Sequence, residues 1–229
     1  MEKEITFILP CLNEEKTLEF CLNEIENYIK QKNLNAEILL ADNNSTDKSR
    51  EIAKKHNVRV VICKEKGYGN TLINGTKHAY GKYCIMGDCD GSYDFADVDG
   101  FIELLRNGYD LVVGNRFAGG IEKGAMPLSH HWGVKMLSGI ANFFFKTPIK
   151  DYHCGLRGYN KQRMIKLNLK QGGMEYASEM IIKAQKQHYK MIEIPTKLRK
   201  DLRDRKPHLK TITDGIKHLK LIVKLIYTE

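Results

Sequence analysis

The sequence predicts an α/β fold, in which a mainly parallel β-sheet is flanked by helices and a basic amphipathic helix ends the chain. Short apolar runs alternate with segments of helical periodicity along the first half of the chain. Polar clusters follow several of the apolar runs, at the positions where strands of such a sheet end. A chain of 229 residues, 42% hydrophobic and 28% charged, is long enough to bury the core of this fold.

Apolar or β-branched runs that are closed by polar or turn residues predict the strands. They span residues 5–9, 36–41, 58–62, 82–86 and 110–113, and a later strand spans 191–194. Pro10 closes the first of them because a proline has no N–H to donate to the sheet. Helical segments separate consecutive strands, so the sheet is expected to be mainly parallel.

Apolar residues spaced three to four positions apart predict the helices. In the first half of the chain they cover residues 18–29, a segment through 52–56, a segment from Gly67 and Gly69 to Tyr80, and residues 101–105. A loop is expected at residues 119–124. After it, helices are predicted at residues 134–145 and 175–187. Thr46 or Asp47 is expected to cap the second helix, because a side-chain oxygen can accept from the free N–H groups of a first turn.

The six cysteines include no C-x-x-C pair, and several lie within apolar runs. This pattern indicates reduced structural thiols rather than a disulfide framework or a zinc site. The first residues lack the basic flank and apolar stretch of a signal peptide. No apolar stretch is long enough to cross a bilayer. The sequence therefore predicts a cytoplasmic protein.

The formal charge of +9 is concentrated near the end of the chain, where residues 197–224 carry ten Lys or Arg and three Asp. Within 210–227, four lysines share one helical face and the apolar side chains lie roughly opposite. A basic amphipathic helix is expected at an anionic membrane surface, and the alternative is a helix that packs its apolar side on the sheet. Nucleic acid is not predicted as a partner, since the acidic residues at the sheet edge would repel its backbone.

Asp88 and Asp90 stand two residues apart, directly after the apolar run 83–86. In extended backbone they would point to the same face, where two carboxylates repel each other unless a cation lies between them. Such oxygen ligands suit Mg²⁺ or Mn²⁺, which completes its shell with water and substrate phosphates. The sequence predicts a divalent-metal site that holds a diphosphate, and a turn or helix cap is the alternative.

The acidic pair belongs to a set of motifs that resembles the family 2 glycosyltransferases with the GT-A fold, a Rossmann-like fold, and more narrowly their polyprenyl-phosphate (dolichol-phosphate) hexosyltransferase branch. The motifs are Leu9-Pro-Cys-Leu-Asn-Glu14, Asp42-Asn-Asn-Ser-Thr-Asp47, Gly67-Tyr-Gly69, Gly87-Asp-Cys-Asp-Gly-Ser-Tyr-Asp-Phe95, Gly114-Asn-Arg116, Asp151-Tyr-His-Cys-Gly-Leu-Arg157 and Arg203-Asp-Arg-Lys-Pro-His-Leu209. Each motif alone is weak, but together they cover nearly the whole chain in the order of the family.

The resemblance implies a metal-dependent, inverting transfer of a hexose from a UDP- or GDP-linked donor to a polyprenyl phosphate. It implies a peripheral enzyme at the cytoplasmic face of a membrane, with a GT-A domain in residues 1–200 and an acceptor loop and membrane-facing helix in 201–229. By position, the implied catalytic residues are Asp88, Asp90, Arg116 and Arg203, and Asp88 and Asp90 are also the implied ligands of Mg²⁺ or Mn²⁺. The residues implied to bind the nucleotide sugar are Pro10, Asn13, Glu14, Asp42, Gly67 and Asp88. The residues implied to bind the acceptor phosphate are Arg116, His131, Arg203, Arg205 and His208.

The chain departs from the family pattern at two places. No glutamine follows the acidic pair, and His130-His131-Trp132 stands where relatives often carry arginine. Several of the implied residues keep a structural alternative: a surface ion pair for Arg116, a solvated loop for Arg203 and Arg205, a turn for Gly67 and Gly69, and a helix start for Asn13 and Glu14. A transferase acting on a sugar hydroxyl, with Asp94 as a candidate base, remains an alternative, as does a lipid- or nucleic-acid-binding module without catalysis.

Overall fold

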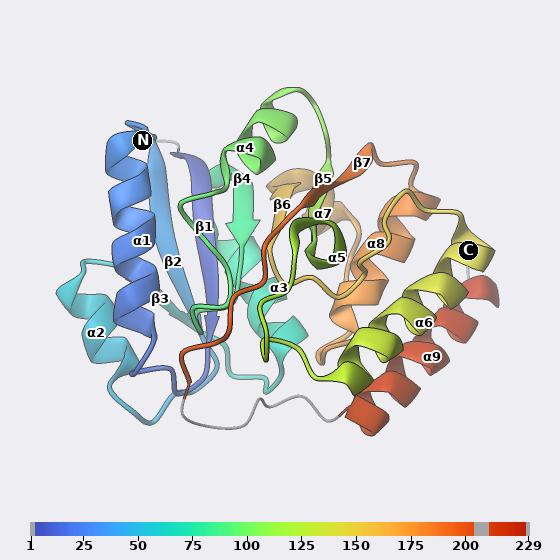
Figure 1. Ribbon diagram of the computed structural model, residues 1–229. Coiled ribbons are helices and arrows are strands. Elements are labelled where there is room, and N and C mark those ends of the chain that lie inside the picture. Colours follow the sequence, from blue (N-terminus) through green and yellow to red (C-terminus); the bar gives the residue numbers. More distant parts are fainter. Residues whose placement is uncertain (1–2, 204–210, 228–229) are drawn as a thin grey trace.

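The computed structural model describes residues 3–203 and 211–227. They contain a seven-stranded sheet in the order β3-β2-β1-β4-β6-β5-β7, with helices packed around it (Figure 1). The strands are β1 (Lys3–Cys11), β2 (Ala36–Asp42), β3 (Arg59–Ile62), β4 (Gly81–Met86), β5 (Leu111–Asn115), β6 (Arg157–Asn160) and β7 (Met191–Pro195). All six predicted strands are present, and the predicted α/β class with a mainly parallel sheet is confirmed.

Strand β6 was not predicted from the sequence, and it lies antiparallel between β4 and β5. Its four residues contain no apolar run that would reveal a strand. The glycine at position 158 lets this strand pack closely on its neighbours, because a Cβ there would stand 3.0 Å from the side chains of both Ile85 and Leu105. The strand is therefore specified by tertiary packing and not by its own side chains.

The helices are α1 (Leu18–Gln31), α2 (Ser49–Lys55), α3 (Tyr68–His78), α4 (Asp99–Arg106), α5 (Arg116–Gly119), α6 (Leu128–Phe145), α7 (Lys161–Lys166), α8 (Tyr176–Lys186) and α9 (Thr211–Tyr227). The short helices α5 and α7 were not predicted. Helix α6 begins six residues before the predicted start at Val134, directly after Pro127. A proline suits a helix entrance because the first N–H groups of a helix have no partner within it.

Consecutive residues of β1 show how the helices cover the two faces of the sheet. The ring of Phe7 packs against Tyr28 of α1, and Tyr28 donates to Asp99 of α4 at 2.6 Å. Ile8 points to the other face, where it lies against Gly75 of α3. Helix α3 in turn contacts α7 and α8. The sheet is therefore buried on both sides, which leaves the ends of its strands as the natural place for a site.

Helices α6 and α9 lie side by side at the β7 end of the sheet (Figure 1). The buried face of α9 carries His218, Leu221, Ile222 and Leu225, and its exposed face carries both lysines and the apolar residues Ile216, Leu219 and Val223. The predicted basic amphipathic helix is present, but its apolar side chains are divided between the core and the surface. The predicted boundary at residue 200 stays a prediction. Within the described ranges, no helix has both the length and the apolar content needed to span a bilayer.

Candidate functional site

One large cavity of about 980 Å³ opens at the carboxyl ends of β1 and β4. Its size lies within the usual range for small-ligand sites, about 300–1,000 Å³. The polar end is lined by Pro10, Glu14, Asn43, Gly67, Tyr68, Asp88, Asp90, Arg116 and Arg203; the apolar end is lined by Met126, Pro127, Val134, Leu137, Met174, Ala177, Ile216 and Leu219. The cavity therefore joins the predicted acidic site to the facing sides of α6 and α9.

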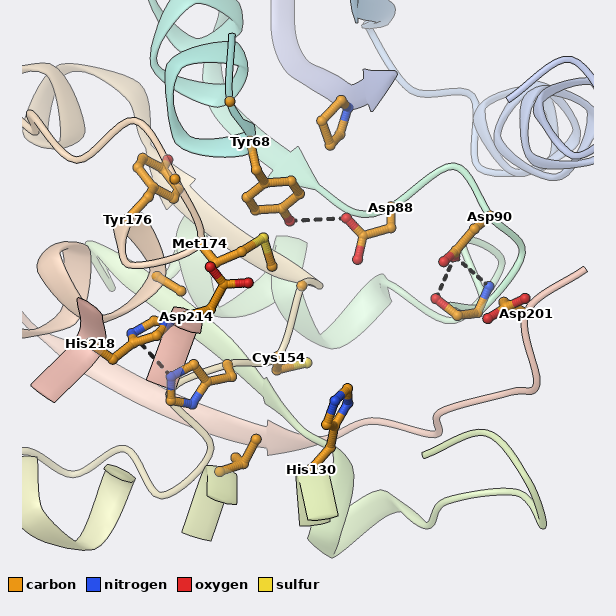
Figure 2. Close-up of a pocket in the computed structure, with 18 of the residues that line it drawn as sticks. Tyr68, Asp88, Asp90, His130, Cys154, Met174, Tyr176, Asp201, Asp214 and His218 are labelled. Carbon is orange, nitrogen blue, oxygen red and sulfur yellow. Dashed lines mark hydrogen bonds between the residues drawn. The ribbon is translucent and has the colours of Figure 1, made fainter. Parts of the chain in front are cut away.

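Asp88 lies in the loop after β4, and the hydroxyl of Tyr68 donates to its Oδ1 at 2.9 Å (Figure 2). Burial, and next the negative charge of Asp90, raise the pKa of Asp88 to about 6. The Tyr68 hydroxyl and the charge of Arg203 lower this pKa, but they do not cancel the two larger effects. The ionised form of Asp88 is therefore disfavoured, first by burial and next by the neighbouring carboxylate.

Asp90 is buried and is held by two neighbours. The backbone N–H and the hydroxyl of Ser92 donate to its Oδ1 at 3.0 and 2.6 Å, and Arg203 Nη2 lies 2.6 Å from its Oδ2. The two aspartates do not share one strand face as predicted, because the chain turns at Cys89 and Asp90. Both carboxylates nevertheless line the same cavity.

Arg203 connects the acidic pair to the end of the described chain segment 3–203. Besides Asp90, its guanidinium lies 3.6 Å from Glu14 Oε1 and 3.3 Å from Asp201 Oδ2. Its Nε is buried without a hydrogen-bond partner among the described residues. An unsatisfied buried donor on a cation is costly, and an anionic ligand in the cavity would satisfy it.

The acidic pair fits a divalent cation. The carboxylates of Asp88 and Asp90 line the same cavity, and carboxylate oxygens are the ligands that Mg²⁺ and Mn²⁺ prefer. In residues 3–203 and 211–227, no group of three or more His, Cys, Asp or Glu is arranged to hold a metal ion. A cation held by Asp88 and Asp90 would take its other ligands from water and phosphate oxygens.

Arg116 lines the cavity at the start of α5, and most of its guanidinium is engaged by Asp151. Its Nε and Nη2 donate to the two carboxylate oxygens of Asp151 at 2.7 and 2.8 Å, and its backbone N–H donates to the same side chain at 3.1 Å. Asp151 is fully buried, so the surface ion pair considered as an alternative is replaced by a buried one. Removing one partner of such a pair typically costs about 3–5 kcal/mol of stability.

The residues predicted for the nucleotide sugar divide into two groups. Pro10, Glu14 and Gly67 line the cavity. Asn13 does not, and its side-chain oxygen accepts from the backbone N–H of Thr46 at 2.7 Å. Asp42 is fully buried, is not among the residues that line the cavity, and pairs with Arg50 at 2.7 Å. Here Asn13 and Asp42 hold the loop after β2.

The backbone conformation and the close packing at position 67 require a glycine. Its φ of +129° is unfavourable for residues with a Cβ, and a Cβ there would stand 2.2 Å from the carbonyl oxygen of Gly172. A Cβ on Gly69 would likewise stand 2.1 Å from the carbonyl oxygen of Gln171. The two glycines therefore allow the start of α3 to approach the backbone of residues 171–173.

The residues predicted for the acceptor phosphate are only partly brought together. Arg203 and Arg116 face the cavity. His131 does not line it and packs edge-on against Phe117, whereas the neighbouring His130 lines it (Figure 2). Arg205 and His208 lie outside the described residues.

Sequence reasoning missed Tyr68 and Asn43 as site residues. Tyr68 lies directly beside Asp88 in Figure 2, and Asn43 Oδ1 accepts from the backbone N–H of Gly67 at 2.9 Å. Both belong to motifs that the sequence does show, Asp42–Asp47 and Gly67–Gly69. Their partners lie 20 or more positions away in the chain, so no local spacing reveals which side chain of each motif faces the cavity.

Two histidines join α9 to the wall of the cavity, the buried His218 and the half-buried His153. His218 Nδ1 lies 2.8 Å from Ser178 Oγ of α8 and 3.3 Å from His153 Nε2. Burial lowers the pKa of His218 to about 4, and the charges of Arg157 and Lys217 act in the same direction against Asp214. Burial, and next the neighbouring His218, lower the pKa of His153 well below its usual value.

We expect these two histidines to make the fold sensitive to mild acid. Between the unfolded pKa of about 6.5 and the folded pKa of His218, about 4, the unfolded chain binds protons that the folded chain does not. Stability is therefore lost as the pH falls through this window. The melting temperature of His218→Asn, measured from about pH 7 to about pH 5, should fall less than that of the wild-type chain. The exposed His188→Asn should match the wild type, and equal slopes for all three proteins would contradict this expectation.

The comparisons with known proteins agree with the fold. The family model described as glycosyl transferase family 2 matches residues 6–167. A low-salt glycan biosynthesis hexosyltransferase of Haloferax volcanii is 29% identical over 221 residues, which cover 96% of this chain and 53% of that protein. This chain therefore spans about half the length of that relative.

Two further relatives are a dolichol-phosphate mannosyltransferase of Pyrococcus furiosus, 28% identical over 96% of this chain and 64% of its own length, and a dolichyl-phosphate hexose transferase of Haloferax volcanii, 25% identical over 99% of this chain and 95% of its own length. Among solved structures, glucosyl-3-phosphoglycerate synthase from Mycobacterium tuberculosis, in complex with Mn²⁺, UDP and phosphoglyceric acid, superposes with a TM-score of 0.77. It shares 15% sequence identity, with 99% of this chain and 80% of that chain covered, and this likeness shows the fold.

Proposed function

The chain belongs to glycosyl transferase family 2, and we propose that it transfers a hexose from a UDP- or GDP-linked donor to a polyprenyl phosphate with inversion at the anomeric carbon. One observation carries this proposal: the acidic pair Asp88 and Asp90 and the guanidinium of Arg203 line one cavity. Carboxylates suit a cation on the donor diphosphate, and a guanidinium suits an acceptor phosphate.

In the donor half of the cavity, Asp88 and Asp90 would hold Mg²⁺ or Mn²⁺, and Pro10, Glu14 and Gly67 would line the nucleotide pocket. When bound, the cation stabilises the negative charge that develops on the leaving diphosphate. Tyr68 orients Asp88 through its hydrogen bond. The guanidinium of Arg203 forms an ion pair with Asp90 Oδ2. We expect this guanidinium to shift toward the acceptor phosphate when substrates bind.

In the acceptor half, Arg203 would bind the phosphate of the lipid, with the fork of the guanidinium and its Nε, which has no partner among the described residues, as donors. A phosphate monoester with a second pKa of about 6 is largely ionised near neutral pH. It can attack the anomeric carbon without a base, from the side opposite the leaving group, so one displacement inverts the configuration. The side chains then orient the two substrates and offset their charge.

The alternative acceptor, a sugar hydroxyl, would need a base at the site. Asp94 was the candidate, but its side chain forms an ion pair with Arg199 and accepts from the backbone N–H of Ala96. It is not among the residues that line the cavity. The position of Asp94 therefore favours phosphate over hydroxyl as the acceptor.

We also propose that α6 and α9 dock the protein on an anionic membrane surface at its cytoplasmic face. Their exposed sides carry large apolar residues, Leu128, Trp132, Met136, Phe143, Ile216, Leu219, Val223 and Tyr227. Lys217, Lys220 and Lys224 stand on the same exposed side of α9. Apolar area combined with lysines is the composition of helices that lie in a membrane interface.

Vesicle flotation tests the membrane proposal. Replacing Trp132 and Val223 together with glutamate is expected to reduce binding to vesicles that contain anionic lipid, because both side chains are exposed and would enter the interface. The exposed Phe20 lies on α1, outside α6 and α9, so Phe20→Glu is the control and should bind like the wild type. Equal flotation of all three proteins would contradict the docking surface.

A panel of donors tests the proposed activity itself. UDP- and GDP-linked hexoses are incubated with a short-chain polyprenyl phosphate and Mn²⁺ or Mg²⁺, and the lipid product is detected by mass spectrometry. We expect one donor to give a hexosyl phosphoryl lipid, and we expect product to disappear on chelation of the metal. Transfer to free sugars or glycolipids, with none to the lipid phosphate, would favour the hydroxyl acceptor instead.

A further inference from the structure

Helix α9 (Thr211–Tyr227) is held on the rest of the fold by one face. The buried side chains of this face are His218, Leu221, Ile222 and Leu225, and their spacing of three or four positions brings them together on a helix. Helix α9 contacts α6 and α8. His218 therefore brings a titratable group into an otherwise apolar contact.

The polar neighbours of His218 at this contact carry no negative charge. Its Nδ1 faces the hydroxyl of Ser178 on α8 at 2.8 Å and Nε2 of His153 at 3.3 Å. The rings of the two histidines meet edge to face, with their centroids 4.4 Å apart. Burying a cation without an anionic partner is unfavourable, so this contact favours the neutral form of His218.

Several cations surround the two imidazoles. Burial is the largest cause that lowers the pKa of each, followed for His153 by the other imidazole. Arg157, at the start of β6, acts in the same direction on both histidines, and Arg116 adds to the effect on His153. Lys217, the neighbour of His218 on α9, does the same for His218.

The nearby acids are paired with lysines. Asp214 of α9 raises the pKa of His218, but its Oδ1 lies 3.5 Å from Lys217 Nζ. On α8, Glu179 forms an ion pair with Lys183 at 2.7 Å and accepts from the backbone N–H groups of residues 170 and 171. Helix α6 contains no acidic residue, and its titratable residues are His130, His131 and Lys135.

We propose that mild acid releases α9 from α6 and α8 while the sheet stays folded, and that this release removes one wall of the cavity. Residues 214–219 of α9 line the cavity, so its apolar end depends on the docked helix. In the released helix the His218 imidazole is in water, with its ordinary pKa of about 6.5; in the docked helix its pKa is about 4. Between these two values the released helix binds a proton that the docked helix does not, so docking weakens as the pH falls. The release does not depend on the proposed reaction.

The expected size of the effect follows from these two pKa values. From about pH 7.5 to about pH 5.5, His218 alone should raise the ratio of released to docked helix by about 10-fold. His153 acts in the same direction, because burial and the neighbouring His218 lower its pKa as well.

Hydrogen exchange of the whole chain, followed by mass spectrometry, locates the release. Exchange in α9 reports its local opening, and exchange in the central strand β2 (Ala36–Asp42) reports unfolding of the sheet. Each rate is divided by that of an unstructured peptide of the same residues at the same pH, which removes the ordinary pH dependence of exchange. We expect α9 to be less protected than β2 throughout, and its corrected rate to rise by about 10-fold or more from about pH 7.5 to about pH 5.5.

Two variants assign the effect to the buried imidazole. His218→Asn removes the titrating group and should lose most of the rise in α9. His188→Asn should keep the full rise, since His188 is exposed and has a φ of +54°, which asparagine tolerates. An equal rise in His218→Asn, no rise in the wild type, or equal protection of α9 and β2 at both pH values would overturn the proposal.

A titration of the imidazole signals by NMR needs no variant. In the wild-type chain, His218 should remain mostly neutral down to about pH 5.5, because the docked helix holds it in the neutral form. If His218 titrated at its ordinary pKa of about 6.5 while α9 stayed protected, docking would not be linked to its proton and the proposal would fail.

Discussion

Asp90→Asn is expected to lower hexose transfer by about 100- to 1,000-fold, the usual cost of removing one group that stabilises developing charge. Asparagine keeps the size of the side chain and an oxygen for the hydrogen bonds from Ser92. The substitution removes the negative charge of the carboxylate. This charge would hold a cation, and it pairs with Arg203 Nη2 at 2.6 Å. The rate of transfer, measured over a range of Mn²⁺ concentrations, checks the prediction.

Asp88→Asn should lower transfer to a similar extent. Its melting temperature shows whether the lost activity comes from the missing negative charge or from a destabilised fold. Burial and the charge of Asp90 raise the pKa of Asp88, so the ionised carboxylate is unfavourable in the metal-free fold near neutral pH. Asp88→Asn should therefore melt no lower than the wild type without metal. The exposed Asp97→Asn is the control and should keep full activity. Wild-type transfer and metal dependence in either variant at 88 or 90 would contradict the assignment.

Arg203→Ala is the second change with a large expected effect. Arg203 lies against Asp90, Glu14 and Asp201, and its buried Nε has no partner among the described residues. Truncating one member of a buried charged pair typically costs about 2–5 kcal/mol, and we expect this loss to appear as a lower kcat/KM for the lipid phosphate. Steady-state kinetics with varied acceptor checks it.

Two further variants define the role of Arg203. Arg203→Lys keeps the charge but loses the planar fork, so it should recover part of the acceptor affinity. Lys200→Ala, an exposed lysine of the same segment, should leave transfer unchanged. If Arg203→Ala raised the KM for the nucleotide sugar and not for the acceptor, the side chain would belong to the donor half of the site.

The acidic pair could be predicted from the sequence because it follows a clear apolar strand and the ends of parallel strands gather at one edge of the sheet. Pro10 and Glu14 were implied by the family resemblance, and they line the same cavity. The prediction of the acidic pair needed only the order of strands and helices. The family model matches residues 6–167, a range that includes these four residues.

Other features depend on contacts between distant parts of the chain. Strand β6 has no periodicity of its own and is defined by β4 and β5 on either side. The pairs Tyr68–Asp88 and Arg116–Asp151 are separated by 20 and 35 positions in the chain. No spacing rule relates such residues, because the turns between them set which side chains meet. The division of α9 into a buried and an exposed apolar side follows from its neighbours α6 and α8 in the same way.

Calorimetric titration of UDP and GDP, with and without Mn²⁺, measures most directly whether the acidic pair holds a cation on the donor diphosphate. For the wild type we predict that one of the two nucleotides binds tightly only when Mn²⁺ is present, and that Asp88→Asn and Asp90→Asn both lose this metal-dependent binding. Binding that is equally tight without metal, or unchanged in both variants, would contradict the role assigned to Asp88 and Asp90.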